Sequence, residues 1–144
     1  FPYTTLFRSV RLLRRHELGL FAVSTTRTKQ QLATAVMRRL ALTDVNKEPT
    51  ANERAHIEAV YDEVLEDLSQ QDKVYWISDS IPIGVFNAIV RIVAEEVCPT
   101  FGVPVPTEQD ESGAAVSIGN HGRRILDRHM ARSATGLPVR AQYF

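Results

Sequence analysis

The sequence predicts an all-α fold, a small bundle of about four helices around a central apolar helix, followed by an extended C-terminal arm. Residues 80–98, SIPIGVFNAIVRIVAEEVC, form the most apolar stretch, with apolar side chains around most of a helical circumference. Segments with helical spacing of apolar residues precede and follow this stretch. One neighbour cannot cover a helix that is apolar on most sides, so we expect it to be buried by several.

Length and composition are those of one compact domain. The single cysteine, Cys98, excludes a disulfide framework or a cysteine-based metal site, and we expect it to pack in the core. The central stretch is shorter than the ~20 apolar residues that a bilayer requires, and charged residues such as Arg91 and Glu95 interrupt it. The sequence therefore excludes a membrane span there.

The first nine residues, FPYTTLFRS, read codon for codon as the translation of a common short-read sequencing adapter. We expect residues 1–22 to lie outside the fold, residues 23–132 to form the helical domain and residues 133–144 to form the arm. Val23 is a candidate start, because GTG also begins bacterial genes. Without residues 1–22 the chain has 13 Lys or Arg against 16 Asp or Glu, so the domain is mildly acidic.

Two capping boxes predict the starts of the first two helices. Thr28 with Gln31 predicts a helix over residues 29–41, and Thr50 with Glu53, directly behind Pro49, predicts a long second helix. The second helix has an acidic outer face, for which a solvated surface is the usual explanation. Its members are Glu58, Asp62, Glu63, Glu66 and Asp67.

An extended connection is expected between the second and central helices. It contains four apolar residues that we expect to contact the helices or a neighbouring subunit, namely Val74, Tyr75, Trp76 and Ile77. Ser80 is the predicted N-cap of the central helix, Pro82 lies in its first turn, and Pro99 is predicted to end it.

Thr107 is the predicted cap of a fourth helix. Acidic residues follow at its start and basic residues toward its end, as the helix dipole favours; they are Glu108, Asp110 and Glu111, then Arg123, Arg124, Arg128 and Arg132. Gly113, Gly119 and Gly122 weaken the early turns, so a break near Gly119 is an alternative.

No P-loop, dinucleotide fingerprint, zinc-helix motif or nucleophile elbow is present. The Gly119–Gly122 stretch before two arginines fits either a phosphate cradle or, more simply, a helix break. His121 and His129 are two helical turns apart, too far for one metal, and adjacent Glu95 and Glu96 point apart. We expect no catalytic residue, cofactor or metal, and no enzymatic activity.

The C-terminal arm carries the strongest functional signal. Apolar and aromatic residues in a segment without helical periodicity suit a groove or sheet edge of a partner, and Arg140 suits a carboxylate. The alternative is that the arm folds back over its own bundle. The predicted partner-binding residues are Gly136, Leu137, Pro138, Val139, Arg140, Gln142, Tyr143 and Phe144.

The order of these features resembles a known family. The segments TRTKQQLATAVMRRL, VYWISDSIP, EEVCPTFG and GLPVRAQYF, with the long acidic helix between the first two, resemble the head-to-tail adaptor proteins of tailed bacteriophages. The nearest group is the tail accessory factors, or packaged-DNA stabilisation proteins, of short-tailed phages. The likeness runs from about Thr26 to Phe144.

The resemblance implies a structural virion protein that is assembled in the bacterial cytoplasm and located at the head–tail junction. It implies binding under the phage portal protein after DNA packaging, self-association into a ring, commonly of twelve copies, and an extended DNA exit channel. Family members send a C-terminal extension along the portal, which matches residues 136–144 here. Downstream tail proteins and passing DNA, without sequence-specific contacts, are the other implied partners. The acidic second helix then lines the channel or points outward.

The main alternative is a small helical DNA-binding regulator that uses the basic residues of the fourth helix. The acidic domain and the absence of a helix-turn-helix spacing disfavour it. A cell-wall-degrading enzyme would need two placed carboxylates, and no such pair stands out.

Overall fold

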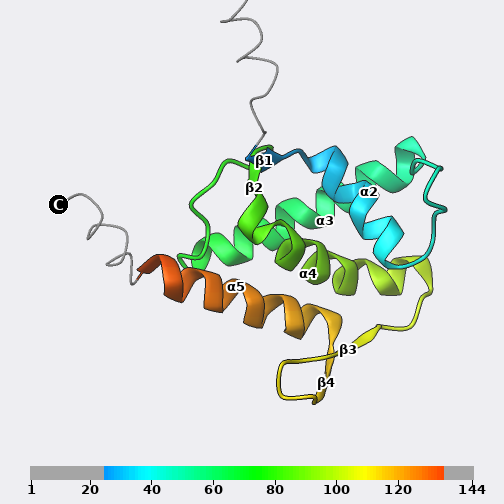
Figure 1. Cartoon of the computed structure of the whole chain (residues 1–144). Coiled ribbons are helices and arrows are strands. Elements are labelled where there is room, and N and C mark those ends of the chain that lie inside the picture. Colours follow the sequence, from blue (N-terminus) through cyan, green and yellow to red (C-terminus); the bar gives the residue numbers. More distant parts are fainter. Residues whose placement is uncertain (1–24, 135–144) are drawn as a thin grey trace, which may run out of the picture.

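The computed structural model describes residues 25–134, which are mostly helical (Figure 1). The helices are α2 (Lys29–Arg39), α3 (Ala51–Gln70), α4 (Ile83–Phe101) and α5 (Ile118–Ala134). Two short antiparallel strand pairs accompany them, β1 (Thr26–Arg27) with β2 (Ile81–Pro82), and β3 (Thr107–Gln109) with β4 (Ala115–Ser117). The predicted helical bundle is confirmed, but the fold is not purely all-α. The predicted arm lies outside the described residues, apart from the last two residues of α5.

Both predicted capping boxes are present. The Thr28 side chain accepts a hydrogen bond from the Gln31 backbone N–H, and the Gln31 side chain accepts one from the Thr28 backbone. Thr50 and Glu53 repeat this arrangement at the start of α3. In each case a side chain satisfies backbone donors that the first helical turn leaves free, which is why these two helix starts follow from the sequence.

The start of α4 corrects the prediction that Ser80 is its N-cap. Ile81 and Pro82 are extended and pair with Arg27 and Thr26, and the Ile83 N–H donates to the Thr25 carbonyl at 3.1 Å. The helix therefore begins at Ile83, and Pro82 in the cap position makes no side-chain cap hydrogen bond. Pairing with β1 holds this segment extended where a local cap was expected.

The end of α4 also differs from the prediction. Pro99 lies inside the helix, which continues to Phe101. Gly102 then adopts a left-handed conformation with φ 65°, and the Val103 N–H donates to the Cys98 carbonyl at 3.1 Å. This is a Schellman-type ending, so the glycine ends α4 and the proline removes only one backbone donor.

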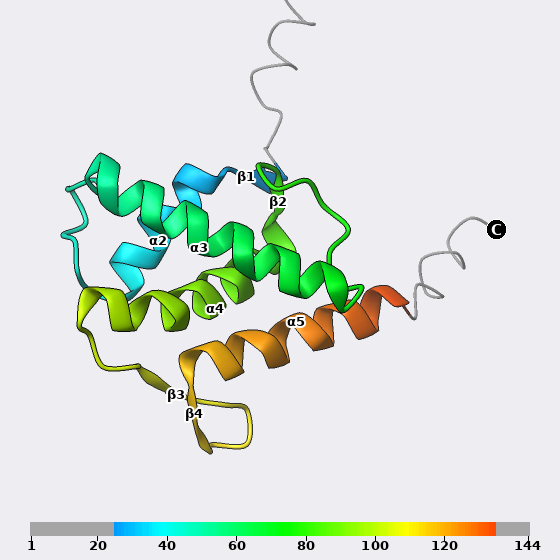
Figure 2. The same ribbon diagram turned by 180° about the vertical axis from the view of Figure 1, so that it is seen from behind.

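The central position of α4 is confirmed. It packs against α2, α3 and α5, and it lies in front of α3 in Figure 1 and behind it in Figure 2. Most of its apolar side chains are buried, including Cys98. The largest fully buried side chains of the described residues come from every helix and from β2: Tyr61, Leu32, Met37, Ile57, Ile81, Ile89, Ile92, Ile118, Leu126, Val36, Val85 and Val93.

The segment before α5 is a β-hairpin, so the prediction that Thr107 caps a helix is wrong. Thr107 pairs with Ser117, and Gly113 in the connecting turn has φ 80°, a conformation that favours glycine. The helix starts at Ile118 and is continuous through Gly119 and Gly122, so no break occurs there. A Cβ at Gly122 would lie 2.6 Å from the Ala88 carbonyl oxygen, so the glycine allows α5 to approach α4 closely.

Candidate functional site

The loop between α3 and α4 carries the four residues of the predicted subunit contact. Val74 and Trp76 are partly buried against the core, whereas Tyr75 is 56% exposed and Ile77 is 78% exposed. The Trp76 Nε1–H donates to the Tyr61 hydroxyl at 3.3 Å, and that hydroxyl donates to the Ser78 carbonyl at 3.0 Å. The loop is therefore anchored from inside while two apolar side chains remain available to a partner.

The same loop lies against the C-terminal half of α5. The Tyr75 hydroxyl is 3.2 Å from His129 Nε2, and Lys73 Nζ is 2.8 Å from the Asp127 carboxylate. Figure 2 shows α5 running past the end of α3 toward the point where the described residues stop. The predicted subunit contact thus lies beside the helix that leads into the predicted arm, residues 136–144, which are outside the described residues.

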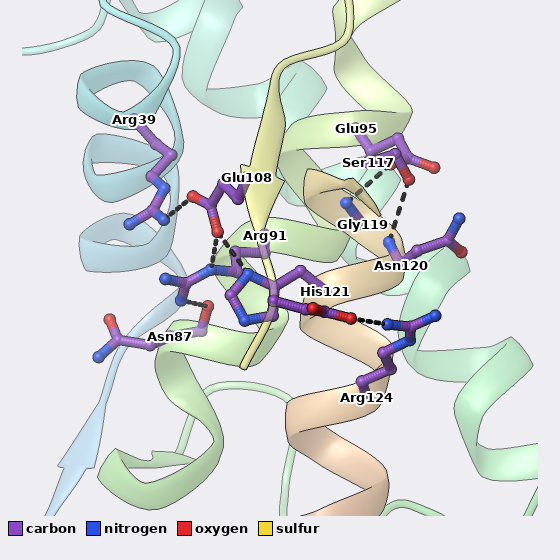
Figure 3. A network of polar contacts seen from close by, with 11 residues as sticks. Arg39, Asn87, Arg91, Glu95, Glu108, Ser117, Gly119, Asn120, His121 and Arg124 are labelled. Carbon is purple, nitrogen blue, oxygen red and sulfur yellow. Dashed lines mark hydrogen bonds and ion pairs between the residues drawn. The ribbon is translucent and has the colours of Figure 1, made fainter. Parts of the chain in front are cut away.

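A cluster of partly buried charged side chains around Glu108 connects β3 with α2, α4 and α5 (Figure 3). Glu108, on β3, accepts hydrogen bonds from Arg39 of α2 and, at 2.9 Å, from Arg91 Nε of α4. Its Oε2 atom is also 2.7 Å from His121 Nδ1 of α5. One carboxylate therefore connects the hairpin to three helices, and we call these four residues the Glu108 cluster.

The charge of Glu108 is strongly favoured within this cluster. Burial opposes ionisation, but the hydrogen bonds from Arg91, Arg39 and His121 outweigh it and lower the pKa of Glu108 from 4.5 to about 2. The surrounding groups are charge partners that belong to the chain itself. The Glu108 cluster is thus a structural ion-pair network, because its carboxylate has its contacts within the fold.

The hairpin is attached to α5 by two further ion pairs, from Arg124 to Asp110 and from Arg128 to Glu111. Hydrogen bonds from the Ser112 side chain lower the pKa of Asp110, burial opposes the effect, and backbone N–H groups and Arg124 add to it. The acidic and basic residues were predicted to lie at opposite ends of one helix. Instead the acidic residues belong to the hairpin, and two of them pair with arginines of α5.

The proposed phosphate cradle at Gly119–Gly122 is the first turn of α5. The Gly119 N–H already donates to Glu95 Oε2 at 2.7 Å, and Arg123 lies 3.2 Å from Glu96. Adjacent Glu95 and Glu96 were expected to point apart, but both carboxylates lie within ion-pair distance of the Arg123 guanidinium, at 3.8 Å and 3.2 Å. A carboxylate of the chain occupies the backbone donor that a phosphate would use.

Within residues 25–134 no group of three or more His, Cys, Asp or Glu side chains is arranged to hold a metal ion. His121 contacts Glu108 and His129 contacts Tyr75, so the two histidines serve separate contacts. Burial, followed by the nearby Glu95 charge, raises the pKa of the Cys98 thiol. The helices of this described part are too short or too polar to cross a membrane.

A groove that the sequence did not reveal lies between α2 and the start of α4. It has a volume of about 680 Å³, and Arg27, Arg38 and Arg54 line it. Glu48 is the acidic residue among its lining side chains, and Ile83 and Phe86 supply apolar surface. We call it the arginine groove. Its arginines lie far apart in the sequence, so no local pattern predicted the site.

The positive charges of the arginine groove are only partly balanced by nearby carboxylates. Arg38 donates to the Val45 carbonyl at 3.0 Å, and Arg54 lies 3.5 Å from Glu48 while its buried Nε has no hydrogen-bond partner. The backbone of Arg27 pairs with Ile81, but its side chain has no hydrogen bond or ion pair with the described residues. The groove therefore presents more positive than negative charge.

The acidic face of α3 has the opposite character. Glu58, Glu63, Glu66 and Asp67 have no ion pair within residues 25–134, whereas Asp62 is paired with Lys29. Ser78 joins Asp62 to the loop of the predicted subunit contact, since its hydroxyl donates to the Asp62 carboxylate at 2.9 Å. The acidic face and the exposed loop are therefore contiguous.

Comparisons with protein-family models, curated proteins and solved structures found no match to this chain.

Proposed function

We propose that the protein is a head-to-tail adaptor of a tailed bacteriophage. In this proposal it binds the portal protein through residues 136–144, self-associates into a ring through contacts that include residues 74–77, and extends the DNA exit channel. It acts as a structural component of the virion and contacts passing DNA without reading its sequence. Downstream tail proteins bind the far side of the ring.

One observation carries the proposal beyond the sequence resemblance. Tyr75 and Ile77 are exposed on a loop that Trp76 anchors to the core, and this loop contacts α5 at His129, a few residues before the predicted arm. Large apolar side chains exposed on an anchored loop are typical of contact surfaces. Their position beside α5, the helix that precedes the predicted arm, supports one partner surface that combines a subunit contact and a portal contact.

The charge distribution also supports an adaptor. The described residues carry 12 Lys or Arg against 16 Asp or Glu, and several carboxylates of α3 are unpaired. A surface with this charge repels a polyanion and favours sliding over adhesion. Three arginines of α5 proposed for the alternative DNA regulator, Arg123, Arg124 and Arg128, already form ion pairs inside the chain.

The arm is tested by deleting residues 137–144 and measuring binding to the portal by electron microscopy of the mixed proteins. A second variant with the same eight residues in scrambled order keeps length and composition. We expect both variants to lose portal binding and to keep the helix content seen by circular dichroism. Undiminished binding of the truncated protein would refute the role of the arm. Duplex DNA binding with a steep salt dependence, without portal binding, would favour the regulator.

A further inference from the structure

The arginine groove and the acidic face of α3 are two surfaces of opposite charge on one chain. We propose that the acidic face of one copy docks into the arginine groove of the next copy, so that the chain associates head to tail. The inference rests on the proposed function only in expecting this association to close into a ring. It supplies the second half of the subunit contact, for which residues 74–77 provide the first.

The two surfaces lie on different sides of the molecule, as a head-to-tail contact requires. The groove is lined mainly by α2 and the start of α4, with Arg54 of the first turn of α3 at its edge, and α4 lies in front of α3 in Figure 1. Figure 2 shows α3 in front. At about 3.6 residues per turn, the acidic residues fall on the side of this helix opposite its buried residues Ile57, Tyr61 and Val64. Contacts between two different surfaces produce rings when the rotation closes.

The two surfaces match in length. The acidic face extends over the nine helical steps from Glu58 to Asp67, about 14 Å at 1.5 Å per residue. Helix α2, which forms one wall of the groove, has 11 residues and is therefore about 16 Å long. Arg27 lies before this helix and Arg38 near its end, so positive charges lie at both ends of the wall.

Apolar contact accompanies the charges. Ile83, 45% exposed, and the partly buried Phe86 line the groove, and Ala55 and Ala59 are exposed on α3 among the carboxylates. Small alanine side chains allow a close approach of the helix to the groove. This matters because exposed ion pairs alone contribute little to affinity, so the charges set register and specificity while apolar contact adds to the binding.

A second copy explains the groove better than nucleic acid does. Glu48 on its rim and the apolar side chains of Ile83 and Phe86 suit a protein surface with carboxylates around an apolar centre. A phosphate backbone offers no apolar partner and is repelled by the net negative charge of the described residues. The experiment must therefore distinguish self-association through the groove from nucleic acid binding there.

The test uses charge reversal on the full chain without portal, so it is independent of the arm. One variant carries Arg27→Glu and Arg38→Glu, a second carries Glu63→Lys and Glu66→Lys, and a third carries all four changes and keeps the native net charge. Self-association is measured by sedimentation and light scattering at low salt, and folding by circular dichroism. We expect the unmodified chain to associate with a dissociation constant below about 1 mM.

Each two-site variant alone should associate on the order of tenfold more weakly, because like charges then meet across the contact. An equimolar mixture of the two should associate again, since reversed surfaces pair with each other and native surfaces with each other. The four-site variant should also recover association. Failure of the mixture and of the four-site variant to recover would overturn the proposal, as would an unmodified chain that stays monomeric. Loss of duplex DNA binding in the groove variant, with unchanged self-association, would assign the groove to nucleic acid.

Discussion

The charge of Glu108 makes a contribution to stability that can be measured by a Glu108→Gln substitution. Glutamine has nearly the same shape but no charge, so the ionic contacts to Arg39, Arg91 and His121 are weakened without a cavity. The fall of the Glu108 pKa from 4.5 to about 2 corresponds to about 3.5 kcal/mol, at about 1.4 kcal/mol per pKa unit. The side chain is 22% exposed, and solvent screening reduces the expected loss to about 2 kcal/mol.

This loss should depend on pH in a defined direction. The pKa of Glu108 is lower in the folded chain than in the unfolded chain, so the stabilisation is fully present above about pH 4.5. It disappears progressively as the pH falls toward about 2, where the native carboxyl also becomes protonated. Urea unfolding of both proteins between about pH 7 and pH 2.5 measures the difference, in which the shared groups cancel.

Glu111→Gln is the matched control. Glu111 also pairs with an arginine, Arg128, but its side chain is 74% exposed. Its replacement should change the free energy of unfolding by about 0.5 kcal/mol or less. If the Glu108 variant lost no more than this control, or if its loss were the same at pH 7 and near pH 3, the assigned role of the Glu108 cluster would be wrong.

Two further substitutions test the packing of α5 and the anchoring of the exposed loop. Gly122→Ala gains about 1 kcal/mol of helix propensity, but its Cβ would contact the Ala88 carbonyl, so we expect a net loss of about 1–2 kcal/mol in thermal unfolding. A more stable variant would show that the two helices can separate at no cost. Tyr61→Phe removes the hydroxyl that bonds Ser78 and Trp76, and should lower the free energy of unfolding by about 1–3 kcal/mol. Unchanged urea unfolding and Trp76 fluorescence would contradict the anchoring.

The features that could be predicted from the sequence depend on residues close together in the chain. A capping box needs only two side chains three residues apart, so the starts of α2 and α3 were predicted correctly. The burial of α4 followed from its composition, because apolar residues around a whole helix require several neighbours.

The errors arise where a distant segment decides the local conformation. Ser80 fits an N-cap, yet the pairing of β2 with β1, more than 50 residues earlier, keeps the following residues extended. Thr107 likewise fits a cap, but the Asp110 side chain accepts hydrogen bonds from the Ser112 and Ala114 backbone N–H groups and forms a turn, so the chain folds into a hairpin. A Ser or Thr that could cap a helix therefore gives the same local signal whether a helix or an extended segment follows it.

The candidate site also combines features that nearby residues predict with features that depend on distant segments. The apolar loop at residues 74–77 is visible as a pattern, and two of its side chains are exposed. The Glu108 cluster and the arginine groove each combine residues from several elements, which no spacing rule connects. The cap signal at Thr107 predicts that Glu108 lies at the start of a helix, whereas it pairs with Val116 in the hairpin.

The arginines of this chain differ in what they are free to do. Those at 123, 124 and 128 on α5 face carboxylates of α4 and the hairpin, so an incoming anion would have to displace an intramolecular partner. Among residues 25–134, the side chains of Arg27 and Arg38 pair with no carboxylate, and Arg54 has only the exposed Glu48. An external acidic group therefore meets less competition in the arginine groove than on α5, although α5 has the denser run of basic residues. Intramolecular pairing, and not charge density along the sequence alone, therefore determines which of these arginines are open to an external acidic group.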